Sequence, residues 1–548
     1  MKYERINGHD FYNMVVNASN RLVEESDFVN ALNVFPVPDG DTGTNMSMTF
    51  KAAVKEIENL NSESIGETSK KLAKGALMGA RGNSGVILSQ ILRGISKGLE
   101  GKKDVDSTEL ALAFLEGSKS AYKAVMRPTE GTILSVIRAA AEAAVKEEKQ
   151  DVIDLLKVVV DASKVMLDKT PELLPALKKA KVVDSGGMGL YIILQGMYDA
   201  LKDDIKAEIK DVAVKDANVT GAGAGSAKDV DIKFGYCTEF IILGDAKKAK
   251  AFQDEIEPLG DSMIVVGYDD VIKVHIHTNN PGLVLEKAVA VGELSKIKID
   301  NMREEHREML EKEELLADKS EEVEAEEVEM KKYAFVSVAM GSGITNVLKD
   351  LGVDYVIEGG QTMNPSTQDM MECISKLNAE HIFILPNNKN IIMAANQAAE
   401  IADKDVRVIP TKSIPQGITC ITMFNPEQDV DSNEASLMEA LDMVKTGSVT
   451  YAVRDTEMDG IEIKEGNMLG LVEGKIKKVG EDYFKVAKEI LESMIDDESE
   501  LITIFYGSDV DESKIEDFVT ELEEKYEDFD VQCYKGDQPL YYFIMSVE

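Results

Sequence analysis

The stretch KGALMGARGNSGVILSQILRGI, residues 74–95, shows how the first part of the chain folds. Its second half carries Ile87, Ile91 and Ile95 four residues apart, which is the spacing of one face of a helix. Its first half is rich in glycine, which lets a backbone bend sharply and approach a ligand closely. The stretch therefore predicts a loop that opens an amphipathic helix.

The same helical pattern extends over residues 1–204. Apolar residues recur three and four positions apart, and Gly and Pro fall between the helical stretches. These further stretches cover residues 10–30, 64–78, 107–125, 133–147, 151–167 and 188–201. The simplest packing is a bundle of about eight helices, with ligand sites in the loops between the helices.

Two stretches of unusual composition divide the rest of the chain. Residues 205–231 include the Gly-rich run NVTGAGAGSAKD and predict a flexible linker, and the Glu-rich residues 303–331 predict a second one. Residues 232–302 alternate strand-like runs with turns, which predicts a small α/β domain. In residues 332–548 the runs YAFVSVAM, HIFILP, VRVIP and LITIFYG predict buried strands of another α/β domain.

Composition limits the possible partners. The 548 residues, enough for about three to five domains, carry 61 basic and 100 acidic side chains and a net charge of −39. Such a chain repels phosphates and anionic lipid surfaces, so we expect no nucleic-acid partner. We expect no membrane span, because no run of about 18 apolar residues occurs. Four widely spaced cysteines and a polar start favour a cytoplasmic location.

The loop LNVFPVPDGDTGTNM, residues 32–46, is a candidate metal site. Asp39 and Asp41 offer the hard oxygen ligands that Mg²⁺ prefers, and Gly40 between them permits a sharp bend. Hydroxyl and amide groups follow at Thr42, Thr44 and Asn45. The alternative interpretation is a surface turn in which an Asp caps the next helix.

Three more glycine-containing loops each precede a helix. They contain Gly82, Asn83, Ser84 and Gly85; Arg127, Glu130, Gly131 and Thr132; and Asp184 and Gly187. Backbone N–H groups at a helix start bind anions, and glycine lets a phosphate come close. Each loop alone is also explained as an ordinary capped helix start, with Ser84 capping the helix at 85. Together they indicate a nucleotide held by loops at one end of the helices.

The four segments PVPDGDTGTNM, GARGNSGVILSQ, RPTEGT and VDSGGMGL, in this order, resemble the dihydroxyacetone kinase L-subunit family. They resemble more closely the ATP-binding subunits of bacterial fatty acid kinases. The resemblance implies an antiparallel eight-helix barrel that binds ATP with Mg²⁺, with Asp39 and Asp41 as metal ligands and residues 82–85 as the phosphate loop. It places Thr44, Asn45, Glu130, Gly131, Thr132, Asp184 and Gly187 around the nucleotide. A third Asp of the family corresponds here to Asn33, which offers an amide oxygen without charge.

Phosphoryl transfer needs positioning and neutralisation of charge more than covalent chemistry. A fatty acid carboxylate, with a pKa near ~4–5, is already an anion at pH 7, so no strong base is required. A cation is needed to offset two approaching anions, and Arg81 and Arg127 are the candidates, with Lys74 weaker. All three are equally interpreted as solvated surface cations.

A second metal site is predicted in the small α/β domain. His275 and His277 are separated by one residue on a strand-like run, so they share one face, and Cys237 lies on another candidate strand. One thiolate and two imidazoles suit Zn²⁺, although a fourth ligand is not visible; the alternative is a buried Cys and a polar sheet face. The resemblance implies zinc at these three positions. His381 shows no partner in the sequence.

Residues 332–548 resemble DegV-type proteins, whose members bind fatty acids. The loop GGQTMNPST, residues 359–367, resembles their lipid-headgroup loop, with Thr362, Ser366 and Thr367 as its hydroxyls. These hydroxyls are equally explained as turn groups. The early part of the fold is shortened here, so a docking or scaffolding role is favoured over a lipid pocket.

The sequence therefore predicts a kinase subunit that transfers the γ-phosphate of ATP to a fatty acid carboxylate. A separate DegV-type carrier protein would present the acid, because free acyl chains are poorly soluble, and the acyl phosphate would serve phospholipid synthesis. One alternative is a kinase subunit for dihydroxyacetone or another polyol. The other is a non-catalytic, ATP-binding regulator that senses lipid. The resemblance also implies a homodimer.

Overall fold

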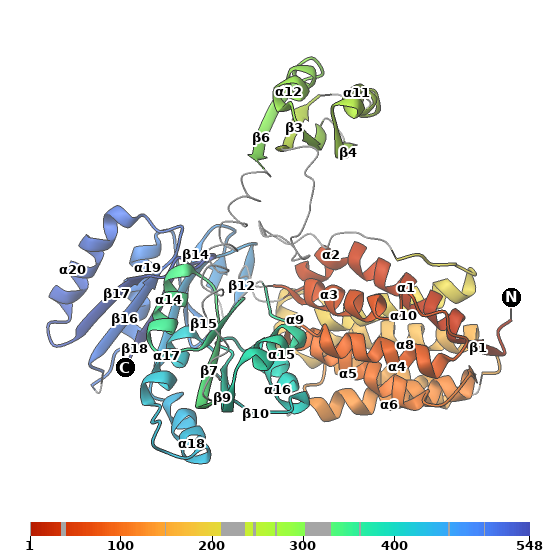
Figure 1. Cartoon of the computed structure of the whole chain (residues 1–548), viewed down its shortest axis with the longest axis horizontal. Coiled ribbons are helices and arrows are strands. Elements are labelled where there is room, and N and C mark those ends of the chain that lie inside the picture. The colour runs from red at the N-terminus through yellow and green to blue at the C-terminus, as the bar shows by residue number, and fades with distance from the viewer. Residues whose placement is uncertain are drawn as a thin grey trace. The chain divides into compact units, whose positions relative to one another are not determined.

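The computed structural model describes residues 2–33, 40–125, 127–147, 149–209, 236–244, 248–268, 271–301, 330–360, 363–458, 461–497 and 499–548. The chain forms two compact units (Figure 1). Residues 1–218 and 329–548 together make the first unit, and residues 219–328 make the second. The domain boundaries predicted from composition stay predictions, as do the two linkers, most of whose residues lie outside the described ranges.

The first part of the chain is helical, as predicted. Its helices are α1 (Gly8–Glu24), α2 (Ser26–Ala31), α3 (Thr42–Lys55), α4 (Ile65–Met78), α5 (Gly82–Gly98), α6 (Ser107–Ala124), α7 (Ile133–Lys146), α8 (Val152–Leu173), α9 (Pro175–Ala180) and α10 (Ser185–Lys202). Two short strands, β1 (Arg5–Asn7) and β2 (Asp104–Asp106), pair antiparallel. Helix α8 runs beyond the predicted residue 167 and includes Pro171. The Thr170 hydroxyl donates to the Leu167 carbonyl at 2.7 Å, which replaces the hydrogen bond that Pro171 cannot donate.

The long helices contact one another in chain order. Each of α1, α3, α4, α5, α6, α7, α8 and α10 contacts the next, and α10 contacts α1. Their apolar faces form one core that includes Phe11, Phe50 and Phe114. Glycine permits a close approach between α5 and α6, where a Cβ on Gly94 would lie 2.3 Å from the carbonyl oxygen of Glu116. The loops at the start of α3, α5, α7 and α10 are therefore carried by a single packed core.

The described residues of the C-terminal part form two larger sheets and the two-stranded antiparallel pair β12-β13. The first is parallel, in the order β10-β9-β7-β8, and the second is mixed, in the order β15-β14-β11-β18-β16-β17. The strands are β7 (Lys331–Ala339), β8 (Tyr355–Glu358), β9 (Ala379–Leu385), β10 (Asp405–Val408), β11 (Lys445–Tyr451), β12 (Thr456–Met458), β13 (Ile461–Ile463), β14 (Met468–Val472), β15 (Lys475–Gly480), β16 (Leu501–Tyr506), β17 (Asp530–Lys535) and β18 (Tyr541–Val547). The helices are α14 (Ser342–Asp350), α15 (Thr367–Lys376), α16 (Ile392–Ile401), α17 (Ile414–Met423), α18 (Val430–Ala440), α19 (Tyr483–Met494) and α20 (Ile515–Lys525). The α/β prediction is confirmed.

One histidine of this part, interpreted from the sequence as a structural or surface residue, has a partner that the sequence did not indicate. His381 on β9 has a partner, because its Nδ1 lies 2.7 Å from a carboxylate oxygen of Asp405 on the neighbouring strand β10. The two residues are directly opposite in the parallel register, which sequence patterns alone do not reveal.

The described residues of the second unit form a four-stranded antiparallel sheet and two helices. The strands β3 (Tyr236–Leu243), β4 (Gly260–Tyr268), β5 (Val271–Thr278) and β6 (Glu293–Asn301) lie in the order β4-β5-β3-β6, and the helices are α11 (Ala249–Ile256) and α12 (Pro281–Val289). Phe240, Ile272 and Phe252 belong to its buried core. Across both units, none of the described helices combines the length and apolar character needed to cross a membrane.

Within the first unit, the helical domain and the C-terminal domain share an interface that we call the seam. Helix α4 contacts α15, and α5 contacts α16 (Figure 1). Ala80 and Val86 are part of the same buried apolar cluster as Met370 and Ala394. Gln397 of α16 is only 5% exposed, and its Nε2 donates to the Leu77 carbonyl at 2.7 Å. The contact between these two domains was not predicted from the sequence.

Candidate functional site

The aspartate loop lies at the start of α3. Asp41 occupies the N-cap position, but its side chain makes no capping hydrogen bond. Asn30 caps this helix instead, because its Oδ1 accepts from the backbone N–H groups of Gly43 at 2.7 Å and Thr44 at 3.2 Å. The Asp41 carboxylate is thus not used as a helix cap. Asp39 lies outside the described residues.

Asn33 connects the aspartate loop with the start of α10. Its Oδ1 accepts from the Thr42 hydroxyl at 2.7 Å and from the Ser185 hydroxyl at 3.2 Å. Two loops that lie far apart in the sequence therefore meet at one amide oxygen. Ser185, adjacent to the predicted Asp184, was not identified from the sequence.

The glycine loop before α5 lies directly against α3. Gly82 has φ +57°, and a Cβ on it would lie 2.4 Å from Nδ2 of Asn45, so only glycine fits here. Helix α5 begins at Gly82, with Arg81 at the N-cap position and no side-chain cap. The interpretation of Ser84 as an N-cap is therefore wrong, because the positive φ at Gly82 starts the helix earlier.

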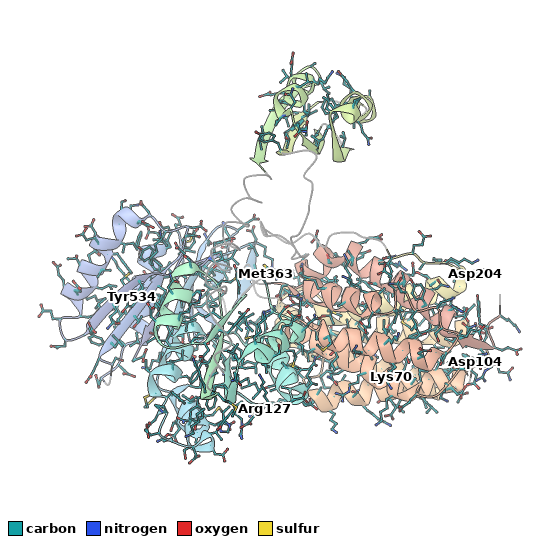
Figure 2. All side chains as sticks on the ribbon, viewed as in Figure 1. Lys70, Asp104, Arg127, Asp204, Met363 and Tyr534 are labelled. Atoms are coloured by element: carbon teal, nitrogen blue, oxygen red, sulfur yellow. The ribbon has the colours of Figure 1, made fainter. Side chains whose placement is uncertain are left out.

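Of the predicted cations, Arg81 contacts residues of the C-terminal domain across the seam. Its Nη1 donates to the carbonyl oxygen of Asn364 at 3.0 Å, and its Nη2 lies 3.5 Å from Asp369. Lys74 pairs with Glu56 at 3.2 Å on the surface. Arg127 is exposed, and Figure 2 shows it where the helical and C-terminal domains meet.

Arg127 and Asn83 line a cavity of about 960 Å³. Helices α5 and α6 form part of its wall, and α16 of the C-terminal domain contributes Ile392, Met393 and Gln397. The volume lies in the range typical of small-molecule sites, roughly 300–1,000 Å³. The sequence did not predict a wall from the C-terminal domain.

The cavity is basic although the chain is strongly acidic. Six cationic side chains line it, against two acidic ones, Glu116 and Glu400. The cations are Arg93, Lys97, Lys119, Lys123, Arg127 and Lys389. In the part of the chain that the structure describes, Arg93, Lys123 and Arg127 form no ion pair. Such a concentration of positive charge favours an anionic ligand.

The loop before α7 is held by Glu130. Its carboxylate accepts from both terminal nitrogens of Arg138, at 2.8 and 2.7 Å, and from the Ser135 hydroxyl. Partial burial opposes ionisation, but these bonds prevail and lower the pKa of Glu130. Gly131 has φ +85°, and the Thr132 hydroxyl caps α7. Glu130 and Thr132 thus fix the shape of this loop.

Asp184 links the starts of α10 and α7. Its Oδ2 accepts from the backbone N–H of Gly187 at 2.7 Å, and its carboxylate also accepts from the backbone N–H of Ile133. Burial raises the pKa of Asp184 to about 6 in spite of these two bonds. Asp184 therefore acts as a helix cap and as a bridge between two of the predicted loops.

The structure adds one residue to the aspartate loop from the C-terminal domain. Asn364 donates through Nδ2 to the Asp41 carboxylate, and the same nitrogen lies 3.4 Å from Oδ1 of Asn45. Asn364 is 1% exposed, and its Oδ1 has no hydrogen-bond partner among the described residues. The residue precedes α15 in the loop that resembles the lipid-headgroup loop, and its neighbour Met363 is labelled in Figure 2.

The hydroxyls of that loop have structural partners. Ser366 caps α15 in a reciprocal arrangement with Asp369. Thr367 is fully buried in the seam, where its N–H donates to the Ala80 carbonyl at 3.2 Å and its Oγ1 accepts from Gln397 at 3.1 Å. Thr362 lies outside the described residues. Ser366 and Thr367 therefore behave as cap and seam groups.

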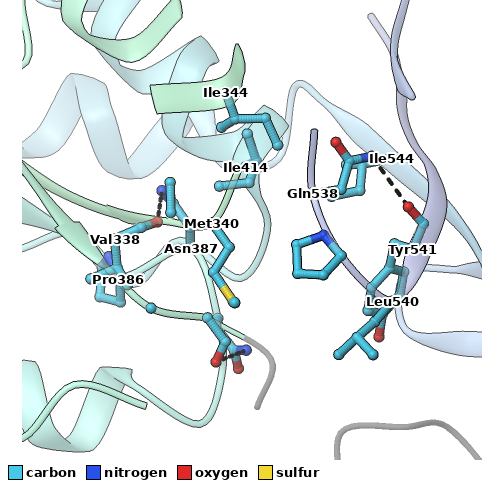
Figure 3. A pocket seen from close by; sticks show the side chains of 15 residues that line it. Val338, Met340, Ile344, Pro386, Asn387, Ile414, Gln538, Leu540, Tyr541 and Ile544 are labelled. Atoms are coloured by element: carbon cyan, nitrogen blue, oxygen red, sulfur yellow. Dashed lines mark hydrogen bonds between the residues drawn. The ribbon is translucent and has the colours of Figure 1, made fainter. Parts of the chain in front are cut away.

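A small cavity lies beside this loop in the C-terminal domain (Figure 3). Val338, Met340 and Ile344 are among its lining residues, and its volume is about 50 Å³. Asn387 closes one side, with its Nδ2 donating to the Val338 carbonyl at 3.0 Å. Organic ligands fill sites of roughly 300 Å³ or more, so an acyl chain does not fit this cavity as it is formed.

The three predicted zinc ligands occupy neighbouring strands of the second unit. Cys237 on β3 is directly opposite His277 on β5, and His275 lies two residues away on the same strand. Directly opposite residues and residues two apart share one face of a sheet. The side chains of these three residues lie outside the described part. Among the residues that the structure does describe, no group of three acidic, His or Cys side chains is placed to hold a metal.

Three family models match the chain, each over a different range. They are the DAK2 domain over residues 36–199, the FakA-like middle domain of fatty acid kinases over 233–309, and the FakA-like C-terminal domain of fatty acid kinases over 334–548. Protein YloV of Bacillus subtilis is 43% identical over 558 residues, covering 100% of both chains. An uncharacterized protein of Staphylococcus saprophyticus is 43% identical over 552 residues, covering 99% of this chain and 100% of that protein.

Two solved structures resemble part of the chain. The Streptococcus pneumoniae fatty acid kinase B3 protein, loaded with linoleic acid, is 10% identical with a TM-score of 0.28, over 40% of this chain and 99% of that chain. DegV of Bacillus subtilis, a fatty acid binding protein, is 10% identical with a TM-score of 0.31 over the same shares.

Proposed function

The chain belongs to the FakA-like family of fatty acid kinase proteins, and from this membership we propose that it transfers the γ-phosphate of ATP to the carboxylate of a fatty acid. One observation carries the proposal beyond the family. The aspartate loop and the glycine loop meet at Asn45, and Asn83 of the glycine loop also lines a cavity with six cationic side chains. An acidic chain concentrates positive charge in this way where it binds a polyanion.

The oxygen-rich end of the site fits Mg²⁺. Asp41 offers a carboxylate, and the Asn33 amide oxygen would contribute by exchanging its hydrogen bond from Thr42 or Ser185. Hard oxygen donors of this kind suit Mg²⁺, and we propose that Asp39 joins them. When bound, the cation supplies neutralisation of phosphate charge.

We place the nucleotide along the glycine loop and the basic cavity. We propose that the first-turn N–H groups of α5 and the side chains of Thr42, Thr44 and Asn45 hold the phosphate end near Asp41, and that Arg127 contacts the nucleotide from the wall of the cavity. Asp184 and Glu130 act indirectly, because they fix the loops before α10 and α7. The unbroken order of helix contacts supports the proposal that these loops sit at one end of an eight-helix barrel.

The acceptor needs no general base. A fatty acid carboxylate, with a pKa near ~4–5, is ionised at pH 7, so what the protein must offset is repulsion between two anions. Arg127, with no ion pair among the described residues, is available for this, whereas Arg81 holds the seam. We propose that a separate DegV-type carrier protein shields the acyl tail and presents its carboxylate. The FakA-like family is named for one component of a fatty acid kinase, which supports such a partner.

The zinc site is proposed for the second unit. In support, the strand register pairs Cys237 with His277, and His275 lies two residues from His277 on the same strand, a backbone arrangement compatible with a Cys/His/His metal set. We propose that these three residues hold Zn²⁺ and stabilise the small sheet.

The experiment is a turnover assay with the purified full chain, ATP, Mg²⁺ and a DegV-type protein loaded with fatty acid. The expected result is ADP release together with an acyl phosphate, trapped as a hydroxamate by hydroxylamine. Dihydroxyacetone replaces the loaded carrier in a parallel reaction. Turnover with dihydroxyacetone alone would establish the polyol alternative, and ATP binding without any transfer would establish the regulatory one.

A further inference from the structure

Asn364 enters the aspartate loop from the other domain. It is 323 residues away from Asp41 in the sequence, yet its amide nitrogen donates to the Asp41 carboxylate and points at Asn45. It is 1% exposed, so this contact is shielded from water. A polar side chain buried so completely normally satisfies all its hydrogen-bonding atoms.

One of its atoms is not satisfied. The amide oxygen of Asn364 is buried and has no partner among the described residues. Leaving a buried acceptor without a donor costs about 1–3 kcal/mol. The oxygen belongs to the same amide group whose nitrogen contacts Asp41.

The seam holds Asn364 in place from several directions. Arg81 donates to its backbone carbonyl at 3.0 Å, and three residues later the Thr367 N–H donates to the Ala80 carbonyl at 3.2 Å. Pro365, between them in the sequence, is also buried. The backbone that carries the Asn364 side chain is therefore held by contacts that do not depend on the Asp41 hydrogen bond.

We propose that Asn364 is a positioning residue of the metal site, supplied to the helical domain by the C-terminal domain. An N–H of its amide holds the Asp41 carboxylate in one orientation, and its amide oxygen would be available to a donor that enters with the divalent cation. Partners that hold a ligating carboxylate raise metal affinity, and removing one costs about 10–100-fold. This inference rests on the proposed function, because it assumes that Asp41 is a metal ligand.

The same contact has an opposite interpretation, which the test separates. If the Asn364 amide merely occupies the Asp41 carboxylate, it competes with the cation, and removing it should increase metal affinity. If it positions Asp41, removing it should decrease metal affinity. The two interpretations therefore predict changes of opposite sign in a single dissociation constant.

The experiment titrates the full chain with Mn²⁺, without nucleotide, and follows free Mn²⁺ by electron paramagnetic resonance. Asn364→Ala is expected to weaken binding about 10–100-fold. Asn364→Leu, which fills the space without an N–H group, is expected to do the same, and circular dichroism and thermal unfolding check that both variants fold. The control is Asn390→Ala, because Asn390 contacts Asn83 across the seam at 3.4 Å and has no hydrogen bond with Asp41.

A double-mutant comparison tests whether the effect passes through Asp41. Asn364→Ala should cause a much smaller further loss of affinity in an Asp41→Asn background, because the carboxylate that it positions is already gone. Unchanged or tighter Mn²⁺ binding in both Asn364 variants would overturn the inference while leaving the proposed function intact. Absence of Mn²⁺ binding in the unaltered chain would overturn the metal site itself, and the proposed function with it.

Discussion

Gln397→Ala should open the seam without unfolding either domain. Gln397 is 5% exposed and lies on α16. Its Nε2 donates to the Leu77 carbonyl at 2.7 Å, and its Oε1 accepts from Gln90 Nε2 at 3.1 Å. The Leu77 carbonyl is in the last turn of α4, where backbone carbonyls have no partner within the helix. The substitution therefore leaves at least two polar groups without their partners.

The magnitude follows from these two groups. At about 1–3 kcal/mol for each unsatisfied buried group, the closed seam should lose about 2–6 kcal/mol. We expect the lower end, about 2 kcal/mol, because water can enter the space left by the side chain. That corresponds to about a 30-fold increase in the population of the open seam.

The assay is thiol labelling in the native state. Ala80 is 0% exposed in the seam, so an Ala80→Cys variant carries a thiol that reacts only when the seam opens. Adding Gln397→Ala should speed its labelling about 30-fold. Asn396→Ala, at the exposed neighbouring position on α16, should leave the rate unchanged. Equal labelling rates with and without Gln397 would refute the seam, as would an equal acceleration by Asn396→Ala.

Three further predictions concern the metal sites and one buried carboxyl group. Asp41→Asn should reduce acyl phosphate formation more than about 100-fold while the circular dichroism spectrum keeps its helical signal, since the side chain lies in a loop. Asp184 has a folded pKa of about 6, above the value of about 3.9 in an unfolded chain, so its contribution to stability is fully present below about pH 4 and is lost as the pH rises through 6. Thermal unfolding at pH 5 and pH 7 should therefore show a smaller difference in Asp184→Asn than in the unaltered chain, and an equal difference would contradict the raised pKa. Elemental analysis should find close to one zinc per chain. A His275→Ala/His277→Ala double variant should lose this zinc, and its second unit should unfold at a lower temperature. A zinc-free chain purified without chelator would contradict the zinc proposal.

Local patterns in the sequence predicted most of the long helices in residues 1–204 and the strands β7, β9, β10 and β16. The spacing of Ile87, Ile91 and Ile95 anticipated α5, and runs such as HIFILP anticipated β9, because both signals depend on neighbours within a few residues. The cap at Ser84 was wrong for a local reason as well, since Gly82 takes a positive φ that starts α5 earlier. Local signals thus identify elements well, and their first residues less well.

The seam could not be predicted in the same way. Periodicity tells which face of a helix is apolar and says nothing about which distant segment covers that face. Two weak signals of the seam were present in the sequence. One is the polar Gln397 within the mostly apolar run IMAANQAA, and the other is Asn364, which lies in the loop where only the hydroxyl residues were predicted to be functional. Neither identifies a partner about 300 residues away. Asn30 caps α3 in place of Asp41, and it was not identified from the sequence. The pattern predicted one helix over residues 10–30, whereas the structure has a break after α1, and Asn30 lies in the short helix α2.

The basic lining of the 960 Å³ cavity has a consequence for the way ionic strength acts on this protein. The electrostatic screening length is about 8 Å at physiological salt and about 30 Å at 0.01 M. In dilute buffer an approaching polyanion is repelled by the whole chain, with its net charge of −39. At physiological salt the distant carboxylates are screened, and the six nearby cations dominate the field at the cavity. Moderate salt should therefore speed the entry of an anionic ligand, the reverse of what a basic site on a basic protein shows.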